Sequence, residues 1–498
     1  MGAVLAGAVL SAVAAARLGV PVLIGFLALG MLLGSDGPGG IEFDDPNVAR
    51  TVGVVGLAII LFEGGLTTPW RAIRPVLVPA TMLATVGVVV STVLTGVAAY
   101  WLFDLSLTTS FILGAVVAST DAAAVFATLR FTTLRRRLSR VLEAESGGND
   151  PMAVALTIGL IHWVQDPSFR AADLAFLVVR QLGVGLVFGL VVGAAAAWIL
   201  ARLPVSIAPF APVASLAVAA LGFGIADVAG GSGFLAVYIV GLCVGHAATP
   251  LRRELVAFHQ GAAFLAQIGL FILLGLYVFP SHLDEVLVSG LALAALVVLV
   301  VRPAAVWIST AFQGFTTPER ALLGWAGLRG AVPIVLATFP QAEGVPGSGT
   351  IFDAVFFVVL VSTLVQGTTL EWVAQRLRLT TRARPVYRPP IEIAAVRELG
   401  ANLLEFGVAP DAAVAGTFVR DLQLPRDSLV AVIVRDGESV LPRGSTQILA
   451  GDRLYVLSRR ESRRTVEDLF ESWRPRRADG RPGSVSYTHL TLPTTSRV

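Results

Sequence analysis

Long apolar runs joined by short polar connections constrain this chain more than any other feature of its sequence. A helix needs about 17–25 mostly apolar residues to cross a bilayer, and a broken helix can be shorter. We count about thirteen such runs, which predict an all-α polytopic membrane domain over residues 1–376. The runs cover approximately residues 2–16, 19–34, 50–68, 75–103, 108–129, 141–164, 173–201, 205–226, 232–247, 259–279, 285–312, 320–340 and 351–375.

The charges of the connecting loops predict how these helices are oriented. Arginines gather in the loops after odd-numbered runs, as at residues 135–140, whereas the alternate loops are acidic or mixed. Cytoplasmic loops carry the excess of basic residues, so the odd loops and the C-terminal region are predicted to be cytoplasmic and the N-terminus to lie outside. Arg50 and Arg170 run against this pattern. The net charge of +3 does not indicate nucleic-acid binding, because the arginines are spread over short loops.

A second, more polar region follows the last apolar run. Residues 377–390 are basic and Pro-rich, which is typical of a linker at the membrane surface. Residues 391–473 predict a small α+β cytoplasmic domain with a hairpin turn at Asp436-Gly437 and a closing helix over 466–473. Its strands are expected in IEIAAVREL, SLVAVIVRDGESV and DRLYVLSRR.

The last residues, 474–498, are expected to be a disordered tail. Within it, the run VSYTHLTLPTT resembles the translation of a transposase sequencing adapter. We therefore interpret residues 484–498 as foreign to the natural chain, whose own C-terminus would then be missing. An ordinary disordered end is the alternative.

Polar side chains inside the apolar runs are the candidates for function, because they are costly in a membrane and usually face a cavity or one another. Ser146, Asn149 and Asp150 lie on one face of the sixth helix, three and four residues apart. Pro151 cannot donate a backbone hydrogen bond, so the carbonyl of Gly147 is left free. These oxygens suit an alkali cation better than a transition metal. A buried carboxylate also favours its neutral form, so Asp150 could hold either a proton or a cation.

Two of the predicted helices are expected to be interrupted. Thr120-Asp121 lies in the middle of the fifth run, and the glycines and proline of GLRGAVP break the twelfth. Interrupted helices at corresponding positions of two halves indicate a transport site. The two runs are seven apart, an odd offset, so a repeat that relates them would be inverted in the membrane. The alternative is that the glycines only permit close helix packing.

Three further charged residues lie inside the apolar runs. Arg329 in the twelfth run must be neutralised, and we predict a structural ion pair with Glu145, although a pair with Asp150 is the alternative. Arg302 has no partner that the sequence identifies. Glu63 could contribute to the ion path or simply face cytoplasmic water.

Several motifs occur in order along the membrane domain and resemble the NhaP-type potassium/proton antiporters of the cation:proton antiporter superfamily. They are LALGMLLGSDGPGGIEFDD, IILFEGGL, STDAAAVF, ESGGNDPMAV, GFLAVYIVGL and GLRGAVPI. The resemblance implies a thirteen-helix homodimer in a bacterial plasma (inner) membrane. It also implies a dimerisation bundle and a mobile core, in which two crossed, broken helices meet near the ion site.

The same resemblance implies roles for particular residues. Asp150 would be the carboxylate that carries the ion or the proton, supported by Asn149 as in the electroneutral branch of the family. Thr120 and Asp121 would sit at the helix break, and Ser146 beside the ion. Glu145 with Arg329 resembles the structural ion pair of the family.

Residues 401–458 resemble regulatory domains of the TrkA-C type, in the segments RDLQLPRDSLVAVIVRDG and PRGSTQILAGDRLYVL. No GxGxxG motif follows a strand here, so the nucleotide-binding half of such regulators is absent. The domain is predicted either to sense a small ligand, such as a nucleotide, or to act as a structural dimer clip.

Together these observations predict a secondary active transporter that exchanges K+ or Na+ for H+ without net charge movement, with K+ favoured. Cation and proton would compete for Asp150 during alternating access, and neither a cofactor nor a resident metal is expected. A channel-like conductance would need a filter such as TVGYG, and an intramembrane enzyme would need a set such as HExxH. Neither motif occurs in the sequence.

Overall fold

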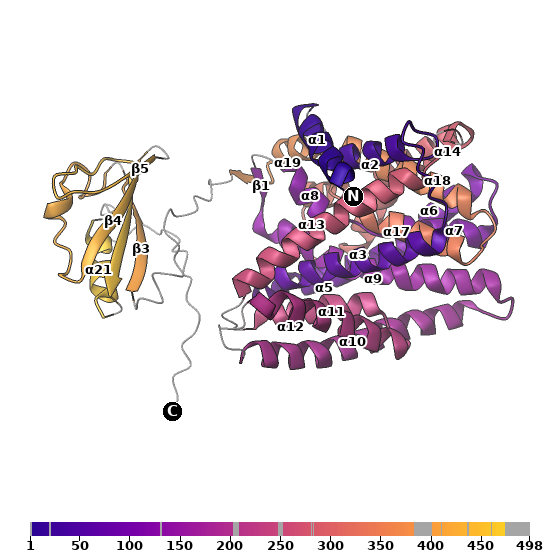
Figure 1. The fold of residues 1–498 in the computed structure, drawn as a ribbon, viewed down its shortest axis with the longest axis horizontal. Helices are drawn as coiled ribbons and strands as arrows, with labels where there is room; N and C mark the ends of the chain where they lie inside the picture. Colours follow the sequence, from indigo (N-terminus) through magenta and orange to yellow (C-terminus); the bar gives the residue numbers. More distant parts are fainter. Residues whose placement is uncertain are drawn as a thin grey trace. The chain divides into compact units, whose positions relative to one another are not determined.

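A computed structural model gives the fold, which divides into two compact units over residues 1–383 and 384–498 (Figure 1). Each unit is described by itself. The described residues are 2–18, 21–129, 132–202, 209–247, 252–279, 281, 283–382, 401–409, 411–435, 438–459 and 461–473.

The first unit is built almost wholly of helices, and each predicted apolar run coincides with one helix or with consecutive helices. Seven helical stretches in the described part are long and apolar enough to cross a membrane, and five shorter helices are also apolar. The polar sixth segment, α9, is a single helix of 30 residues. The helices are α1 (Gly2–Leu18), α2 (Val22–Leu33), α3 (Pro46–Thr67), α4 (Trp70–Ile73), α5 (Leu77–Met82), α6 (Val88–Leu102), α7 (Leu107–Ala118), α8 (Ala122–Thr128), α9 (Arg136–Gln165), α10 (Ala171–Leu200), α11 (Ala211–Val228), α12 (Gly233–His246), α13 (Arg252–Tyr277), α14 (Leu283–Leu296), α15 (Arg302–Ser309), α16 (Thr317–Trp325), α17 (Ala331–Ala342), α18 (Ser348–Val361) and α19 (Gly367–Arg376).

Three π-helical turns interrupt long membrane segments of this unit. They are η2 (Leu83–Gly87) between α5 and α6, η5 (Val297–Val301) between α14 and α15, and η6 (Ser362–Gln366) between α18 and α19. A π-turn adds a residue to a helical turn, which rotates the side chains that follow, and such turns are frequent at functional sites. A short 3-10 turn, η1 (Arg74–Val76), joins α4 to α5.

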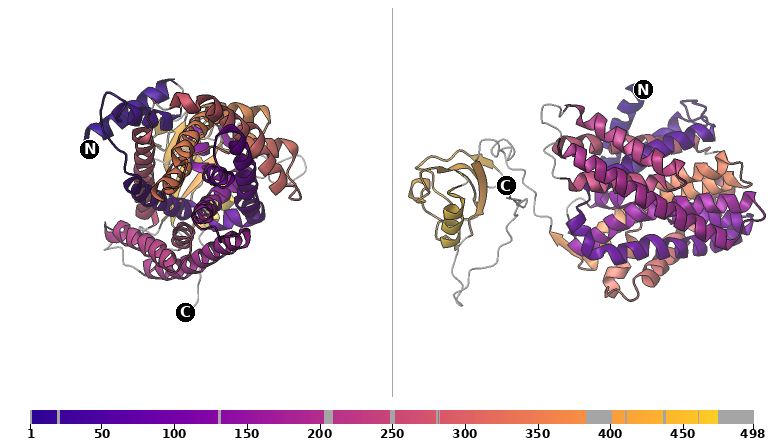
Figure 2. Two further views of the ribbon diagram at one scale, coloured as in Figure 1. Left: turned by 90° about the vertical axis from the view of Figure 1, so that its right-hand side faces the viewer. Right: turned by 90° about the horizontal axis from the view of Figure 1, so that it is seen from below.

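The helices of the first unit pack as two bundles. The first bundle holds α1–α3 and α10–α13, and the second holds α4–α9 and α14–α19. In the first bundle, α10, α11 and α12 lie side by side along one edge (Figures 1 and 2). Gly30 on α2 and Gly65 on α3 lie directly against the backbones of α13 and α12, respectively. Glycines at the boundary between the bundles contact side chains instead, as Gly53 on α3 contacts Val335 on α17.

The second unit contains a four-stranded antiparallel sheet and one helix. The strands are β3 (Ala401–Gly407), β4 (Ser428–Arg435), β5 (Glu438–Val440) and β6 (Arg453–Arg459), in the order β3-β6-β4-β5. The turn η7 (Val419–Asp421) precedes β4, and α21 (Arg463–Ser472) packs Val466 and Phe470 into the apolar core of the unit. The sequence therefore predicts the fold class correctly: an all-α membrane domain followed by a small α+β domain.

Some predicted features fall elsewhere or outside the described residues. Residues 380–382, expected in the linker, form strand β2 (Thr380–Arg382), which pairs with β1 (Thr132–Leu134). The strand expected in IEIAAVREL, the turn at Asp436-Gly437 and the tail over 474–498 lie outside the described residues.

Candidate ion-binding site

The site lies where the two interrupted segments meet. The chain is extended over Ser119 and Asp121 between α7 and α8, and the second break separates α16 from α17. The backbone N–H of Asp121 donates to the carbonyl of Leu328 at 2.8 Å, which joins the two breaks directly. The predicted meeting of two broken helices is therefore confirmed.

Arg329 neutralises the end of α7 and does not pair with Glu145. Its Nη1 donates to the carbonyls of Ala118 at 2.8 Å and Ser119 at 2.6 Å. Carbonyls at a helix C-terminus carry partial negative charge, so a buried cation is favourable there. The backbone N–H of Arg329 donates to Ser362 Oγ at 3.0 Å in η6, which fixes the second break.

The predicted Glu145–Arg329 ion pair is wrong, because Glu145 pairs with Arg302. The guanidinium of Arg302 donates to both carboxylate oxygens of Glu145, at 2.6 and 3.0 Å. Both side chains are almost fully buried, at 3% and 1% exposed. Arg302 follows directly after the π-turn η5, which helps to set the direction in which its side chain leaves the helix. This bidentate pair links α9 to α15.

Asn149 and Asp150 lie beside the first break, as predicted. The amide of Asn149 donates to Thr120 Oγ1 at 2.7 Å and to the Thr120 carbonyl at 3.3 Å. Both Asn149 and Asp150 are buried, at 1% and 5% exposed. Among the described residues, Asn149 Oδ1 and Asp150 Oδ1 are buried oxygens without a hydrogen-bond partner, and the buried hydroxyl of Ser119 lies beside the Asp150 carboxylate. Such a set of oxygens can coordinate a small hard cation, and the carboxylate among them can instead take up a proton.

Asp121 and Ser146, also predicted at the ion, have contacts with α8. The carboxylate of Asp121 accepts from the N–H of Ala124 at 3.1 Å and caps this helix. Ser146 Oγ accepts from the N–H of Ala122 at 3.4 Å. Asp121 is nevertheless close enough to Asp150 to repel its ionised form. The two residues therefore shape the break and the local charge around Asp150.

Exposure varies along α9. Toward the cytoplasmic end of α9, Glu143 and Ser146 are half-buried, whereas residues 149–157 beyond them are all buried. Glu63 on α3 is also half-buried, and no hydrogen bond or ion pair in the described part of the chain joins it to Asp150. Asp150 thus lies in the most continuously buried stretch of α9.

The charges of the site nearly balance. Asp121, Glu145 and Asp150 are three carboxylates, and Arg302 and Arg329 are two guanidinium groups. Glu145 and Arg302 neutralise each other, and Asp121 and Arg329 lie at opposite helix ends of the same crossing. With all five groups ionised, the set carries one net negative charge, which one monovalent cation or one proton would neutralise.

Sequence reasoning did not single out Tyr238 on α12. Its ring packs against Gly147 on α9, and its phenol is within electrostatic reach of Glu143 and Asp150. The first bundle thus places an aromatic side chain against the site helix. A tyrosine inside an apolar run gives no signal that could have identified this role.

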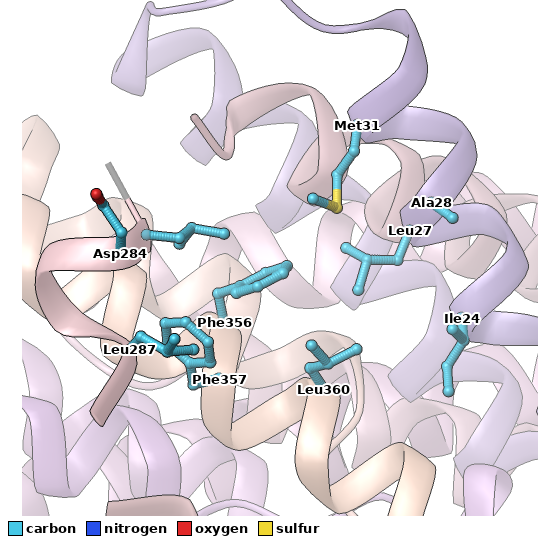
Figure 3. Close-up of a pocket in the computed structure, with 10 residues that line it drawn as sticks. Ile24, Leu27, Ala28, Met31, Asp284, Leu287, Phe356, Phe357 and Leu360 are labelled. Carbon is cyan, nitrogen blue, oxygen red and sulfur yellow. The ribbon is translucent and has the colours of Figure 1, made fainter. Parts of the chain in front are cut away.

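An apolar groove of about 390 Å³ lies between α2, α14 and α18, away from the residues of the site (Figure 3). Leu27 and Met31 of α2 face Phe356 and Leu360 of α18 across it. Asp284 at its rim is the only polar side chain among the lining residues. The groove lacks the several oxygen ligands that a cation needs.

Fold and site together define a polytopic membrane transporter in which broken helices cross beside a buried carboxylate. Residues 2–376 match the family described as sodium/hydrogen exchanger, transmembrane, and residues 403–471 match the TrkA-C domain. The chain belongs to the sodium/hydrogen exchanger family, as a multi-pass membrane protein with a C-terminal TrkA-C domain.

Curated relatives and solved structures agree with this assignment. The chain is 40% identical to the "K(+)/H(+) antiporter NhaP2" of Shewanella sp. (strain MR-4), over 94% of this chain and 82% of the relative. It is 38% identical to the "K(+)/H(+) antiporter NhaP" of Alkalimonas amylolytica, over 89% and 77%. The fold is similar to that of the sodium proton antiporter MjNhaP1 from Methanocaldococcus jannaschii, with a TM-score of 0.65 at 23% identity, covering 76% of this chain and 97% of that one.

Proposed function

We propose that the chain is an electroneutral antiporter that exchanges one monovalent cation, K+ in preference to Na+, for one proton at Asp150. The observation that carries this proposal is the one net negative charge that the ionised carboxylates and guanidinium groups of the site leave. A cation and a proton each neutralise it, and neither leaves a second charge to be moved. Exchange then follows if Asp150 is loaded by one ion at a time and reaches each side of the membrane in turn.

The choice of K+ is supported by the relatives, because those at 40% and 38% identity are named as K(+)/H(+) antiporters. The "Na(+)/H(+) antiporter ApNhaP" of Aphanothece halophytica is 31% identical over 64% of this chain. Sodium/proton exchange by the same site is therefore the second candidate. Neither exchange requires a cofactor, because the ion gradients supply the driving force.

Proteoliposomes with an internal pH dye test this function. The wild type should move protons when K+ is added outside, and the rates with Li+, Na+, K+ and Rb+ would rank the cations. Asp150→Asn removes the exchangeable charge and should abolish the flux. Asp166→Asn is the matched control, because the carboxylate of Asp166 is exposed in an outer loop and accepts its hydrogen bonds from Ser168. Cation-dependent exchange that survives in Asp150→Asn would refute the proposed role of that carboxylate.

Homodimer formation and ligand binding by the TrkA-C domain are also part of the proposal. The dimer is supported by α10, whose most apolar stretch is only 22% buried within one copy although it carries bulky side chains such as Phe176 and Trp198. Cross-linking in native membranes tests it, and a chain that stays monomeric there would contradict it. A nucleotide added to the full-length protein should change the exchange rate if the TrkA-C domain is a sensor.

A further inference from the structure

An ion pair at the outer end of the membrane unit joins the two bundles. Arg50, near the start of α3, donates from Nη1 to Glu343 Oε1 at 2.8 Å. Glu343 follows α17 directly, so the pair connects the first bundle to the second. Both side chains are partly exposed, at 35% and 41%.

Further contacts hold this pair in place. The Arg50 guanidinium lies over the ring of Phe339, with 4.6 Å from its central carbon to the ring centroid. Gln165, the last residue of α9, donates from its amide to the backbone carbonyl of Glu343 at 3.2 Å. The ion pair thus closes a contact among α3, α9 and α17 at their outer ends. A cavity of about 120 Å³, lined by residues of the same three helices, lies at this contact.

The same three helices separate Asp150 from the outside. His162 at the cavity is twelve residues beyond Asp150, which is about 18 Å along the helix axis. Residues 331–340 of α17 are all buried, and Gly53 of α3 lies against Val335 of α17. A path from Asp150 to the outside must therefore part α3 from α9 and α17.

The boundary between the bundles is built to separate. Within the first bundle, some glycines, such as Gly30 and Gly65, lie against the backbone of the next helix, whereas Gly53 and Gly147 at the boundary contact side chains of the other bundle. The apolar groove that α2 forms with α14 and α18 lies on this boundary as well (Figure 3). Side-chain contacts and an exposed ion pair can be broken at a small free-energy cost.

We propose that Arg50 and Glu343 form the outer gate of the transport path. The ion pair, seated on Phe339 and held by Gln165, keeps α3 against α9 and α17 while Asp150 faces the cytoplasm. It separates when the second bundle moves so that Asp150 faces outside. This inference rests on the proposed antiport function, and it assigns to Arg50 and Glu343 control of access and no contact with the ion.

Reversible cross-linking tests the gate in the full-length chain. Cys243→Ser removes the lone cysteine, and Arg50→Cys with Glu343→Cys is then joined by a bifunctional methanethiosulfonate reagent in proteoliposomes. Cross-linking should lower the exchange rate at least tenfold, and a reducing agent should restore it. Exchange that continues at the parent rate in cross-linked protein would overturn the proposal. If the Cys243→Ser parent and the unmodified chain both fail to exchange, the proposed function fails instead.

The matched control joins two outer positions that follow helices of the first bundle. Asp36, after α2, accepts from both the N–H and the hydroxyl of Ser281, after α13, at 3.0 and 2.6 Å. Asp36→Cys with Ser281→Cys, cross-linked in the same way, should leave the rate near that of the parent. Equal arrest in this control would show that any outer cross-link stops exchange, and would count against the gate.

A second measurement uses variants without a cross-linker. Losing an exposed ion pair should shift the equilibrium between inward- and outward-facing states by roughly 1.5- to 5-fold. Arg50→Gln should therefore lower the apparent KM for the cation at the outer face and raise it at the inner face by such factors, whereas Arg50→Lys should stay near the wild type. A loss of protein yield with both KM values unchanged would assign Arg50 a purely structural role.

Discussion

Removing one partner of the buried Glu145–Arg302 pair should destabilise the protein strongly. The pair is bidentate, and its side chains are 3% and 1% exposed, so neither charge can be rehydrated if the other is lost. A buried charge left without its partner typically costs about 3–5 kcal/mol. We expect Arg302→Met and Glu145→Gln each to lower the free energy of unfolding by an amount in this range. The double variant should cost far less than the sum, because it leaves no unpaired charge.

The exposed Arg50–Glu343 pair is the internal control for this prediction. Its distance of 2.8 Å is similar, but it consists of one hydrogen bond and its side chains are 35% and 41% exposed. Such pairs contribute about 0–1 kcal/mol, so Arg50→Gln should change stability little. SDS titration of purified protein in mixed micelles can measure the free energy of unfolding of each variant. The midpoint temperature of heat inactivation gives an independent ranking of the variants by stability.

A double-mutant cycle can also distinguish the observed partner of Glu145 from the one that the sequence predicted. Glu145→Gln should couple to Arg302→Met by about 2 kcal/mol or more, and only weakly to Arg329→Met. If Arg302→Met costs no more than Arg50→Gln, or if the larger coupling is to Arg329, our description of the buried pair is wrong.

Three further predictions follow from the site and from the cytoplasmic domain. Asn149→Asp adds a negative charge and should make exchange electrogenic. A membrane potential of 100 mV should then shift the equilibrium cation ratio by about 50-fold for each net charge moved. An exchange rate and an equilibrium ratio that do not change with voltage would contradict this. A Cβ at Gly330 would collide with the carboxylate of Asp121, so Gly330→Ala should reduce transport severely while Gly261→Ala, which meets nothing within 4 Å, should not. Burial raises the pKa of Asp452, but the hydrogen bonds from a paired arginine and a backbone N–H together lower it by more. The pKa in the folded domain therefore lies below its usual value. The stabilisation is present at neutral pH and lost as pH falls below about 4, through that lowered pKa. Proteolysis of the TrkA-C domain in the full-length chain should therefore rise at acid pH, and less so in Asp452→Asn.

Asp452 has these partners because it is buried directly before the start of β6, next to the end of β4. Arg435 donates from Nε and Nη2 to its two carboxylate oxygens at 2.9 and 2.8 Å, and the N–H of Leu449 donates at 2.8 Å. Both oxygens of this carboxylate thus accept hydrogen bonds that stabilise the fold of the domain. We expect Arg435→Ala to remove the acid sensitivity together with much of the stability of the domain.

Local patterns predicted which polar residues lie at the first helix break. Helical spacing places Asn149 and Asp150 on α9, and a polar Thr-Asp pair inside an apolar run signals the break that contains Thr120. The contact between Asn149 and Thr120 then follows, because both are buried polar groups at one depth and each needs a partner.

The partners of the buried arginines could not be predicted, because they depend on helix rotation and not on residue type. Arg302 and Arg329 are chemically equivalent candidates for Glu145 in the sequence. The π-turn η5 immediately before Arg302 changes the direction of that side chain by a fraction of a turn, and no residue pattern announces it. The pairing of β1 with β2 was missed for a similar reason, since three-residue strands about 250 residues apart carry no periodic signal.

In the proposed electroneutral exchange, the amide of Asn149 limits the work that the protein can do. It is turned toward Thr120, where a carboxylate in its place would bring a second charge. When no net charge crosses the membrane, the electrical part of the proton-motive force does no work on the exchange. A difference of one pH unit supplies about 1.4 kcal/mol and can hold at most a tenfold cation gradient. A membrane potential of 100 mV would add roughly 2.3 kcal/mol for each net charge moved, and electroneutral exchange cannot use this energy. A cell that stores its energy mainly as voltage would therefore use this chain as a valve that balances cation concentration against pH, and would need a different transporter to concentrate cations against both.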